Sequence, residues 1–156
     1  MPEETMTCRS ILLSEHHQDA VSIFVESYAL PPWSEDWSLD LATLRISDMA
    51  ETPGCISAGV FEDGALIGFA VGTPDTSPRG RSLYLREVVL APAQQGRGLG
   101  TILLAEMERL AWEAGYSGVW LVTARAGSTE RFYAKAGFEE TGTLMIFGKD
   151  LLGYEP

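Results

Sequence analysis

Alternate glycines are the residues whose type and spacing point most directly to chemistry. They lie in the sequence QGRGLG at residues 95–100, between a run of apolar residues at 83–90 and a helical pattern of apolar residues at 98–114. The run predicts a strand, and the pattern predicts a helix. The first N–H groups of a helix have no partner inside it and carry a partial positive charge, so they suit a diphosphate group. Glycines let the anion approach the main chain because they have no Cβ atom, and Arg97 can add a positive charge.

The spacing of these glycines excludes two other kinds of phosphate-binding loop. The sequence has no GxxxxGK[ST] motif, which nucleoside-triphosphate-binding loops require. A dinucleotide-binding GxGxxG motif would need a glycine where Thr101 stands. The pattern is instead Gln-x-x-Gly-x-Gly, from Gln95 to Gly100.

Glu87 is the best single candidate for a group that accepts a proton. Strand alternation places it on the same face as Leu85 and Val89. A carboxyl group among apolar neighbours has a raised pKa, which is useful for proton transfer. Two alternatives remain open: a surface ion pair with Arg86 or Arg81, and a chain of water molecules that replaces a single base.

A second cluster combines aromatic and acidic side chains near a Pro-Pro turn. In the sequence LPPWSEDW at residues 30–37, Trp33 and Trp37 alternate with Glu35 and Asp36. Aromatic faces attract ammonium groups, and carboxylates neutralise them, so the cluster predicts a binding site for a small cationic molecule. The structural alternative is a turn fixed by buried tryptophans, and it applies above all to Trp33.

The order of the predicted elements indicates a mixed α/β fold. The predicted strands occupy residues 9–13, 56–61, 65–72, 83–90, 119–123 and 143–149. The predicted helices occupy residues 20–28, 39–46, 98–114 and 128–136. Asp63-Gly64 predicts a hairpin, Ser38 and Ser128 are expected to cap the second and fourth helices, and Gly115 is expected to end the third.

The composition bounds the class of protein. The chain of 156 residues fits a single domain spanning 1–156, and its 46% hydrophobic and 21% charged residues are ordinary for a globular protein. Because 22 acidic residues outnumber 11 basic ones, nucleic acid is not an expected partner. We expect no membrane association and a cytoplasmic location, since neither a membrane-length apolar run nor a signal pattern is present. Cys8 and Cys55 are expected to be reduced, and with His16-His17 they offer no ligand spacing for a metal.

Two motifs resemble those of the GNAT superfamily of N-acetyltransferases. The sequence LREVVLAP at residues 85–92, followed by 95–101, is similar to the family's central coenzyme-binding motif. The sequence RFYAKAGF at residues 131–138 is similar to its FYxxxGF helix. The resemblance is firm over residues 83–149. It implies an α/β (α+β) fold with a mixed, mostly antiparallel central sheet of six to seven strands, flanked by about four helices.

The resemblance also implies that acetyl-CoA is the cosubstrate, and it assigns residues to it. The main chain of Val88, Val89 and Leu90 would pair with the pantetheine arm, in a slot made where one strand splays from its neighbour. The residues expected at the diphosphate are Gln95, Gly96, Arg97, Gly98, Leu99, Gly100 and Thr101.

Tyr133 would be the acid that protonates the departing thiolate. The alternative is that its ring only packs beside Phe132. Many members carry an asparagine where this sequence has Ala126, so Ser128 or Thr129 is expected to supply the missing coenzyme contact.

The predicted function is transfer of an acetyl group to a primary amine of a small cationic molecule. No cysteine lies near the motifs, so direct attack in a ternary complex is favoured over an acyl-enzyme. The PPW-x-E-x-W pattern also resembles GNAT proteins grouped with aminoglycoside-type and other small-amine acetyltransferases. The alternatives are acetylation of a protein N-terminus or lysine, and a non-catalytic module that senses or sequesters coenzyme A. A homodimer is a further expectation from the resemblance.

Overall fold

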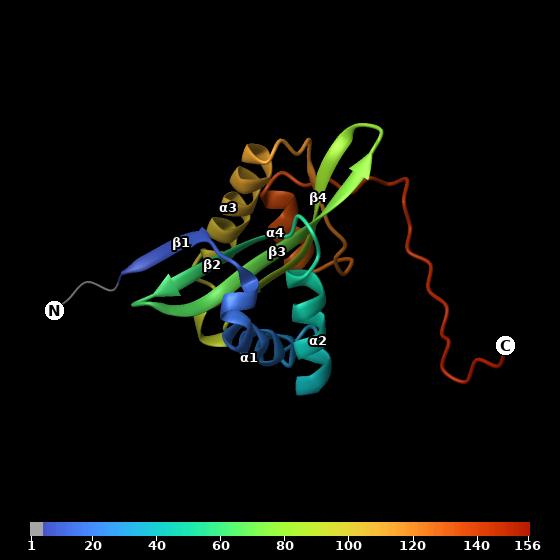
Figure 1. The fold of residues 1–156 in the computed structure, drawn as a ribbon, viewed down its shortest axis with the longest axis horizontal. Helices are drawn as coiled ribbons and strands as arrows, with labels where there is room; N and C mark the ends of the chain where they lie inside the picture. The colour runs from blue at the N-terminus through green and yellow to red at the C-terminus, as the bar shows by residue number, and fades with distance from the viewer. Residues whose placement is uncertain (1–4) are drawn as a thin grey trace. The chain divides into compact units, whose positions relative to one another are not determined.

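The computed structural model describes residues 5–156, which form two compact units, one ending at Val122 and one spanning Thr123–Pro156. The first unit holds a five-stranded sheet and three α-helices, and the second holds one α-helix (Figure 1). The strands are β1 (Met6–Ser10), β2 (Ile56–Glu62), β3 (Ala65–Ser77), β4 (Gly80–Leu90) and β5 (Val119–Trp120). The helices are α1 (His17–Tyr28), α2 (Leu39–Ala50), α3 (Leu99–Glu113) and α4 (Ser128–Lys135), with short 3-10 turns at Leu13–His16 and Pro92–Gln94.

The sheet is mixed and mostly antiparallel, as predicted. Its strands follow the order of the chain, with antiparallel pairing from β1 to β4 and parallel pairing between β4 and β5. A two-residue turn joins β2 to β3, and its residues Asp63 and Gly64 have φ values of 49° and 83°. These positive φ values are those of the tight hairpin that the Asp-Gly pair predicts. The described residues contain five strands, one or two fewer than expected.

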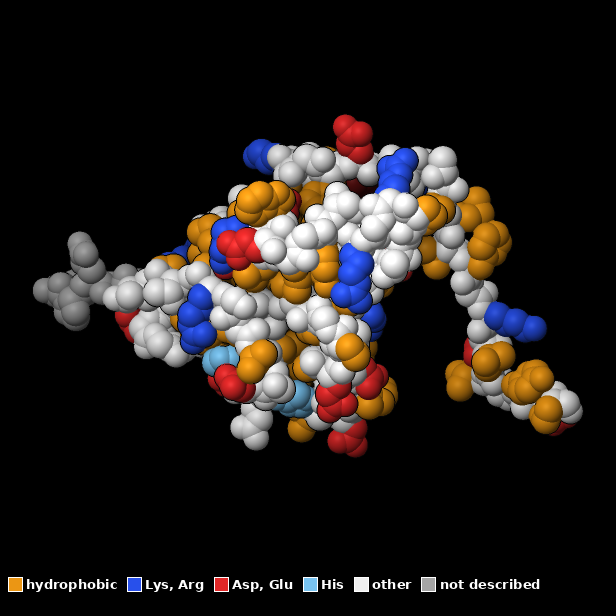
Figure 2. Space-filling model, turned by 45° about the horizontal axis from the view of Figure 1, so that its top comes forward, with side chains coloured by type: hydrophobic (Ala, Val, Ile, Leu, Met, Phe, Trp, Pro, Cys, Tyr) orange, Lys and Arg blue, Asp and Glu red, His pale blue; other side chains and the backbone are white. Residues whose placement is uncertain are grey.

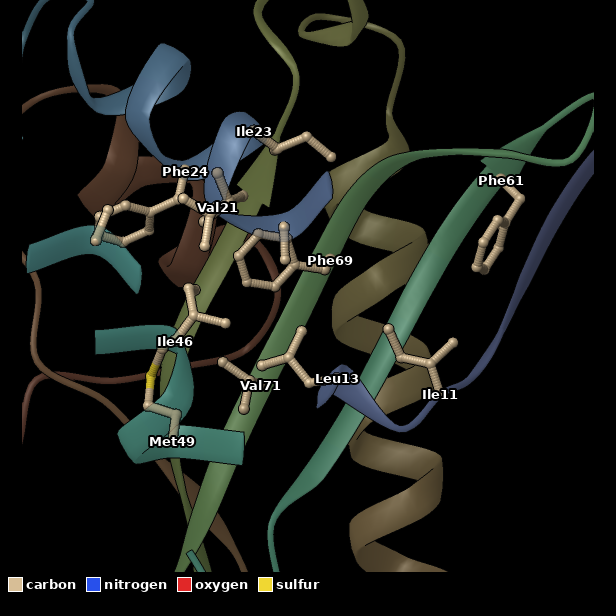
Figure 3. Packing of buried hydrophobic residues seen from close by; sticks show 13 residues of the cluster. Ile11, Leu13, Val21, Ile23, Phe24, Ile46, Met49, Phe61, Phe69 and Val71 are labelled. Atoms are coloured by element: carbon tan, nitrogen blue, oxygen red, sulfur yellow. The ribbon is translucent and has the colours of Figure 1, made fainter. Parts of the chain in front are cut away.

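Helices cover both faces of the sheet in the first unit. On one face, Phe24 from α1 and Ile46 from α2 pack towards Phe69 and Val71 of β3 (Figure 3). On the other face, α3 lies close to the main chain at Gly68, where an added Cβ would be 3.5 Å from Leu103 and only 2.5 Å from Leu90. Glycine is therefore required there by the close approach.

The ends of the helices test the caps and stops that the sequence predicts. The hydroxyl of Ser38 accepts a hydrogen bond from the N–H of Leu41 at 3.2 Å, so the predicted cap of α2 is confirmed. Gly115 follows α3 with a φ of 82°, as a helix-ending glycine should. The predicted cap of α4 is wrong, because Gly127 occupies the cap position and Ser128 is the first helical residue.

Three predicted segments differ from the structure. The first strand is Met6–Ser10 rather than 9–13, because Ile11 and Leu13 enter the core from a connector that leads into α1. The predicted loop after Gly72 is instead an extension of the hairpin, in which Pro78 falls in the turn and needs no N–H partner.

The third difference is the predicted strand at 143–149. These residues form no strand in the structure, and the apolar side chains of this segment are exposed (Figure 2). Leu144, Met145, Ile146 and Phe147 are each 75–86% exposed. An apolar run predicts burial, but only pairing with a neighbouring strand makes it a strand, and the described residues provide no such pairing.

Candidate active site

Helix α3 begins with main-chain donors that no side chain caps. Gly98 occupies the cap position with a φ of 77°, and it makes no side-chain cap bond. Gly96 has a similar φ of 79°. A Cβ added at either glycine would meet no protein atom within 4 Å, so the space in front of this turn is open. The structure thus has the uncapped, unobstructed helix start that a bound diphosphate requires.

Arg97 and Gln95 point their side chains to protein partners. The Arg97 guanidinium lies 3.2 Å from Glu62 Oε1 and also bonds to the side-chain oxygen of Gln94. Gln95 Nε2 donates to Ser27 Oγ at 3.3 Å and so links the loop to α1. Among the predicted loop residues, Gln95 therefore fixes the loop to α1 through its side chain. The Arg97 side chain must leave Glu62 before its charge is fully available to an anion.

One edge of β4 has no strand beside it over half of its length. β5 pairs with β4 only through Leu83 with Val119 and Tyr84 with Trp120. Within residues 5–156, no strand pairs with this edge at positions 85–90, whereas β3 pairs with the other edge at every one of these positions except Arg86. This is the arrangement that the predicted pantetheine slot beside residues 88–90 needs, because an extended chain with amide groups can pair with such an edge.

Glu87 lies under α1 and α2 with both carboxylate oxygens engaged. Glu87 is only 5% exposed to solvent. Oε1 accepts bonds from Arg45 Nε at 2.9 Å and Nη2 at 2.6 Å, and Oε2 accepts a bond from the Tyr28 hydroxyl. The ion-pair partner is thus Arg45 on α2, and neither Arg86 nor Arg81 pairs with it.

The surroundings of Glu87 change its affinity for a proton. Burial raises the pKa of the Glu87 carboxyl above its usual value. The Tyr28 hydrogen bond and the charge of Arg45 oppose this shift without cancelling it. The prediction of a buried carboxyl with a raised pKa is confirmed, and its two polar partners are additions that sequence reasoning missed. Arg45 could have been found, because it stands three residues after Ala42 and four before Met49, which are both buried on the inward face of α2.

A β-bulge in β4 sets the direction of Arg86. Val71 pairs with Glu87 and Gly72 with Leu85, so Arg86 is an extra residue without a partner on β3. The Arg86 guanidinium lies 5.0 Å from the centre of the Tyr84 ring. Tyr84 in turn stacks on Trp120, with ring centres 4.1 Å apart and planes only 7° from parallel.

A cavity of about 260 Å³ lies between α2 and the bulge of β4. Its charged lining consists of Arg45, Arg86 and Asp48, and its apolar lining includes Trp37, Leu41 and Leu44. The cavity therefore combines an apolar surface with charges of both signs, and it borders the strand that carries Glu87.

The predicted acceptor residues divide into two groups. Trp37 lines the cavity, and its indole N–H donates to Glu35 Oε2 at 2.7 Å. Trp33 does not line the cavity and instead packs against the Tyr28 ring at 5.7 Å, which agrees with the structural alternative for this residue. Asp36 is exposed and is not part of the cavity lining either.

The second unit carries Tyr133 on α4. Its half-buried ring contacts the rings of Phe132 at 4.9 Å and Phe138 at 5.7 Å. The position of the missing asparagine, Ala126, has a φ of 63°, and its N–H donates to the Glu130 carboxylate. Ser128 is exposed at the start of the helix.

Other kinds of site find little support in the described residues. No helix in that part of the chain has the length and apolar character to cross a bilayer. Across residues 5–156 no three His, Cys, Asp or Glu side chains gather as a metal site would require. Cys8 and Cys55 are half-buried free thiols, and burial raises the pKa of both, which disfavours the thiolate that a nucleophile needs.

Several solved structures of similar fold are described as acetyltransferases. The chain is similar to aminoglycoside N-acetyltransferase AAC(6')-Iy in complex with CoA, with 18% identity, a TM-score of 0.73, and coverage of 95% of this chain and 97% of that one. It is similar to a possible acetyltransferase from Clostridium difficile 630, with 10% identity, a TM-score of 0.79, and coverage of 93% and 97%. It is also similar to ribosomal-protein-alanine N-acetyltransferase from Brucella melitensis biovar Abortus 2308, with 15% identity, a TM-score of 0.70, and coverage of 94% and 100%.

A family comparison settles what the likeness in fold alone does not. No curated protein matches the sequence. A family model described as "Acetyltransferase (GNAT) family" matches residues 18–138. This stretch contains residues of both units and includes the uncapped helix start, the free edge of β4 and Glu87. The chain belongs to the GNAT acetyltransferase family and is an acyltransferase that uses acetyl-CoA as its acetyl donor.

Proposed function

We propose that the protein transfers an acetyl group from acetyl-CoA to the primary amine of a small cationic molecule, by direct attack in a ternary complex. The observation that carries this proposal is the uncapped start of α3, which follows directly on the unpaired edge of β4. The diphosphate of acetyl-CoA would bind at the start of α3, and its pantetheine amides would pair with the edge of β4. Its thioester is the group that reacts. The residues proposed to hold it are the main chain of 88–90 and of 95–101, with Ser128 from the second unit.

Glu87 is the proposed acceptor of the proton that the amine loses. A free alkylamine is mostly protonated at neutral pH and must give up a proton before it can attack. Because Glu87 is nearly inaccessible, the proton reaches Oε2 through the Tyr28 hydroxyl, which donates its own proton to Glu87 as it accepts the one from the amine. The amine nitrogen bonds to the acetyl carbon, the bond from that carbon to sulfur breaks, and Tyr133 gives its hydroxyl proton to the sulfur. The nitrogen then loses its second proton to solvent, and Tyr133 recovers a proton from solvent.

The acceptor is proposed to bind in the cavity beside α2, against Trp37. The carboxylate of Glu35 lies outside the cavity lining and bonds to the Trp37 indole, and it would add negative charge nearby. Trp33 and Asp36 belong to the same loop and would shape it rather than line the cavity. Similarity to an enzyme described as an aminoglycoside N-acetyltransferase supports an amine acceptor. Another similar structure is described as a ribosomal-protein-alanine N-acetyltransferase, so acetylation of a protein N-terminus is the alternative to a small-molecule acceptor.

Two measurements test the proposed function. Acetyl-CoA at saturation should raise the melting temperature of the protein, because a ligand that binds only the folded state stabilises it. Release of free coenzyme thiol should then depend on an added amine, and a panel of small amines and of peptides with free N-termini would rank the acceptors. A melting-temperature shift without thiol release from any amine would favour a non-catalytic binding module, and release with peptides alone would favour protein acetylation.

Glu87→Gln should flatten the acidic limb of the pH–rate profile. Because the pKa of Glu87 is raised, wild-type activity should be lost as the pH falls through that value, above the range of an ordinary carboxyl group, since the protonated form cannot accept a proton. The glutamine variant has no such titration, so its kcat should be lower by about 100-fold at neutral pH, and the difference should shrink as the pH falls. The check is kcat/KM measured from acidic to neutral pH.

The same substitution also removes the ion pair with Arg45, so a matched double variant is needed. Glu87→Gln alone should lower the free energy of unfolding by about 2 kcal/mol, because it leaves the Arg45 charge without a partner. Adding Arg45→Gln should recover stability and leave the acidic limb absent. Recovery of the limb in the double variant would mean that a group other than Glu87 titrates in the acidic limb.

Trp37→Ala should raise the KM for the amine about tenfold and leave the KM for acetyl-CoA unchanged. Trp37 lines the acceptor cavity and holds Glu35, and loss of an aromatic wall costs about 1–2 kcal/mol. Trp112→Ala is the matched control, since Trp112 is 77% exposed on α3 and away from the cavity lining. An equal rise in both KM values would show that Trp37 has only a structural role.

A further inference from the structure

We infer that the cavity beside α2 recognises a zwitterionic acceptor, an amino acid whose carboxylate binds Arg86, with Asp48 offsetting the positive charge of its ammonium group. This inference rests on the proposed acetyl transfer to an amine and replaces a purely cationic acceptor by one that carries charges of both signs. A molecule that carries only positive charge would face two arginines in the cavity lining, Arg45 and Arg86. An amine that also carries a carboxylate would match both signs of charge.

The charged residues that line the cavity differ in whether they form ion pairs. Arg45 is already neutralised, because two of its N–H groups bond to Glu87 Oε1. Within the described part of the chain, the ion pairs include neither Arg86 nor Asp48. These two residues also do not pair with each other, although they line the same cavity. One positive and one negative group thus line a common space from two different elements, and neither forms an ion pair with a described protein group, although the charge of Arg86 also acts on Glu87.

The position of Arg86 is fixed by the sheet rather than by a flexible loop. The bulge makes Arg86 the unpaired residue of β4, and the stacked rings of Tyr84 and Trp120 support its guanidinium. Arg86 stands two residues before Val88, which is a separation of about 7 Å along a strand. A carboxylate held by Arg86 therefore leaves an adjacent amine within a short reach of the strand edge where the thioester is proposed to lie.

The apolar part of the cavity provides a place for a side chain. Leu41 and Leu44 lie on α2 and line the cavity, yet they are 59% and 55% exposed. Their exposure leaves apolar area that a bound apolar side chain would cover. The cavity therefore fits an amino acid with an aliphatic or thioether side chain.

Matched pairs of an amino acid and its amide test this inference, with leucine, methionine and phenylalanine as the probes. The amide keeps the shape and removes the negative charge. Thiol release at saturating acetyl-CoA should give a kcat/KM at least tenfold higher for the acid than for the amide. The difference should lie in KM. The amide's amine is the less basic of the two, so it would be the better acceptor if Arg86 had no role.

Arg86→Gln should remove the preference by raising the KM for the amino acid and leaving that for the amide unchanged. Arg79→Gln is the matched control, because Arg79 is exposed in the β3–β4 turn, and it should keep the preference. Equal use of acid and amide by the wild type would overturn the inference, as would better use of leucyl-glycine than of leucine. Failure of every amine to release thiol, with acetyl-CoA bound, would instead overturn the proposed function itself.

Discussion

Gly98→Ala is expected to raise the KM and Kd for acetyl-CoA by about 10- to 100-fold, with little change in kcat. Gly98 has a φ of 77° and forms the cap of α3. A Cβ there meets no protein atom within 4 Å, so it would project into the open space where the diphosphate is proposed to bind. Displacing the anion from one or two charge-assisted hydrogen bonds accounts for this range. Calorimetric titration with acetyl-CoA is the measurement.

Gly115→Ala separates the effect on binding from the effect on the backbone. Gly115 follows the other end of α3, has a φ of 82°, and has no protein atom within 4 Å of an added Cβ. Both variants should lose about 1–2 kcal/mol of stability, since alanine disfavours the left-handed region. Only Gly98→Ala should weaken acetyl-CoA binding. Equal affinities for the two variants would show that the start of α3 holds no part of the coenzyme.

Tyr133→Phe is expected to lower kcat about 100-fold while the Kd for acetyl-CoA stays the same. The phenol is proposed to donate a proton to the departing sulfur, and removal of a general acid typically costs this much. The ring contacts with Phe132 and Phe138 involve no hydroxyl, so phenylalanine should preserve the packing of α4. Single-turnover kinetics at saturating acetyl-CoA would measure the chemical step directly.

A matched control removes a tyrosine hydroxyl that has no proposed role. Tyr154→Phe is the control, because Tyr154 is 65% exposed in the C-terminal segment. Unchanged turnover in Tyr133→Phe would leave packing as the only role of this residue.

Much of the fold could be predicted because its signals are local. Asp63-Gly64 defines a hairpin by its own φ values, and Ser38 caps α2 through a contact three residues away. The errors fall where distant partners decide the outcome. Apolar residues at 143–149 resemble a strand, but nothing within the segment provides the neighbour that a strand needs.

The kinds of residue in the site could be predicted from the sequence, but the contacts between them could not. Glu87 was identified by its place on a buried strand, yet its partners Tyr28 and Arg45 lie 59 and 42 residues away in the sequence. The bulge that frees Arg86 is a property of the β3–β4 register, which no pattern in β4 alone reveals. Leu41 and Leu44 belong to the apolar pattern that predicts a helix at 39–46, and nothing in that pattern indicates that they line an open cavity.

Amide chemical shifts during titration with coenzyme A test most directly whether the open start of α3 holds the diphosphate. In a ¹⁵N-labelled protein, the account predicts that the N–H signals of Gly96, Gly98 and Gly100 shift downfield together, and that Gly115 at the far end of the helix does not respond. A titration that saturates with those three signals unmoved would contradict it.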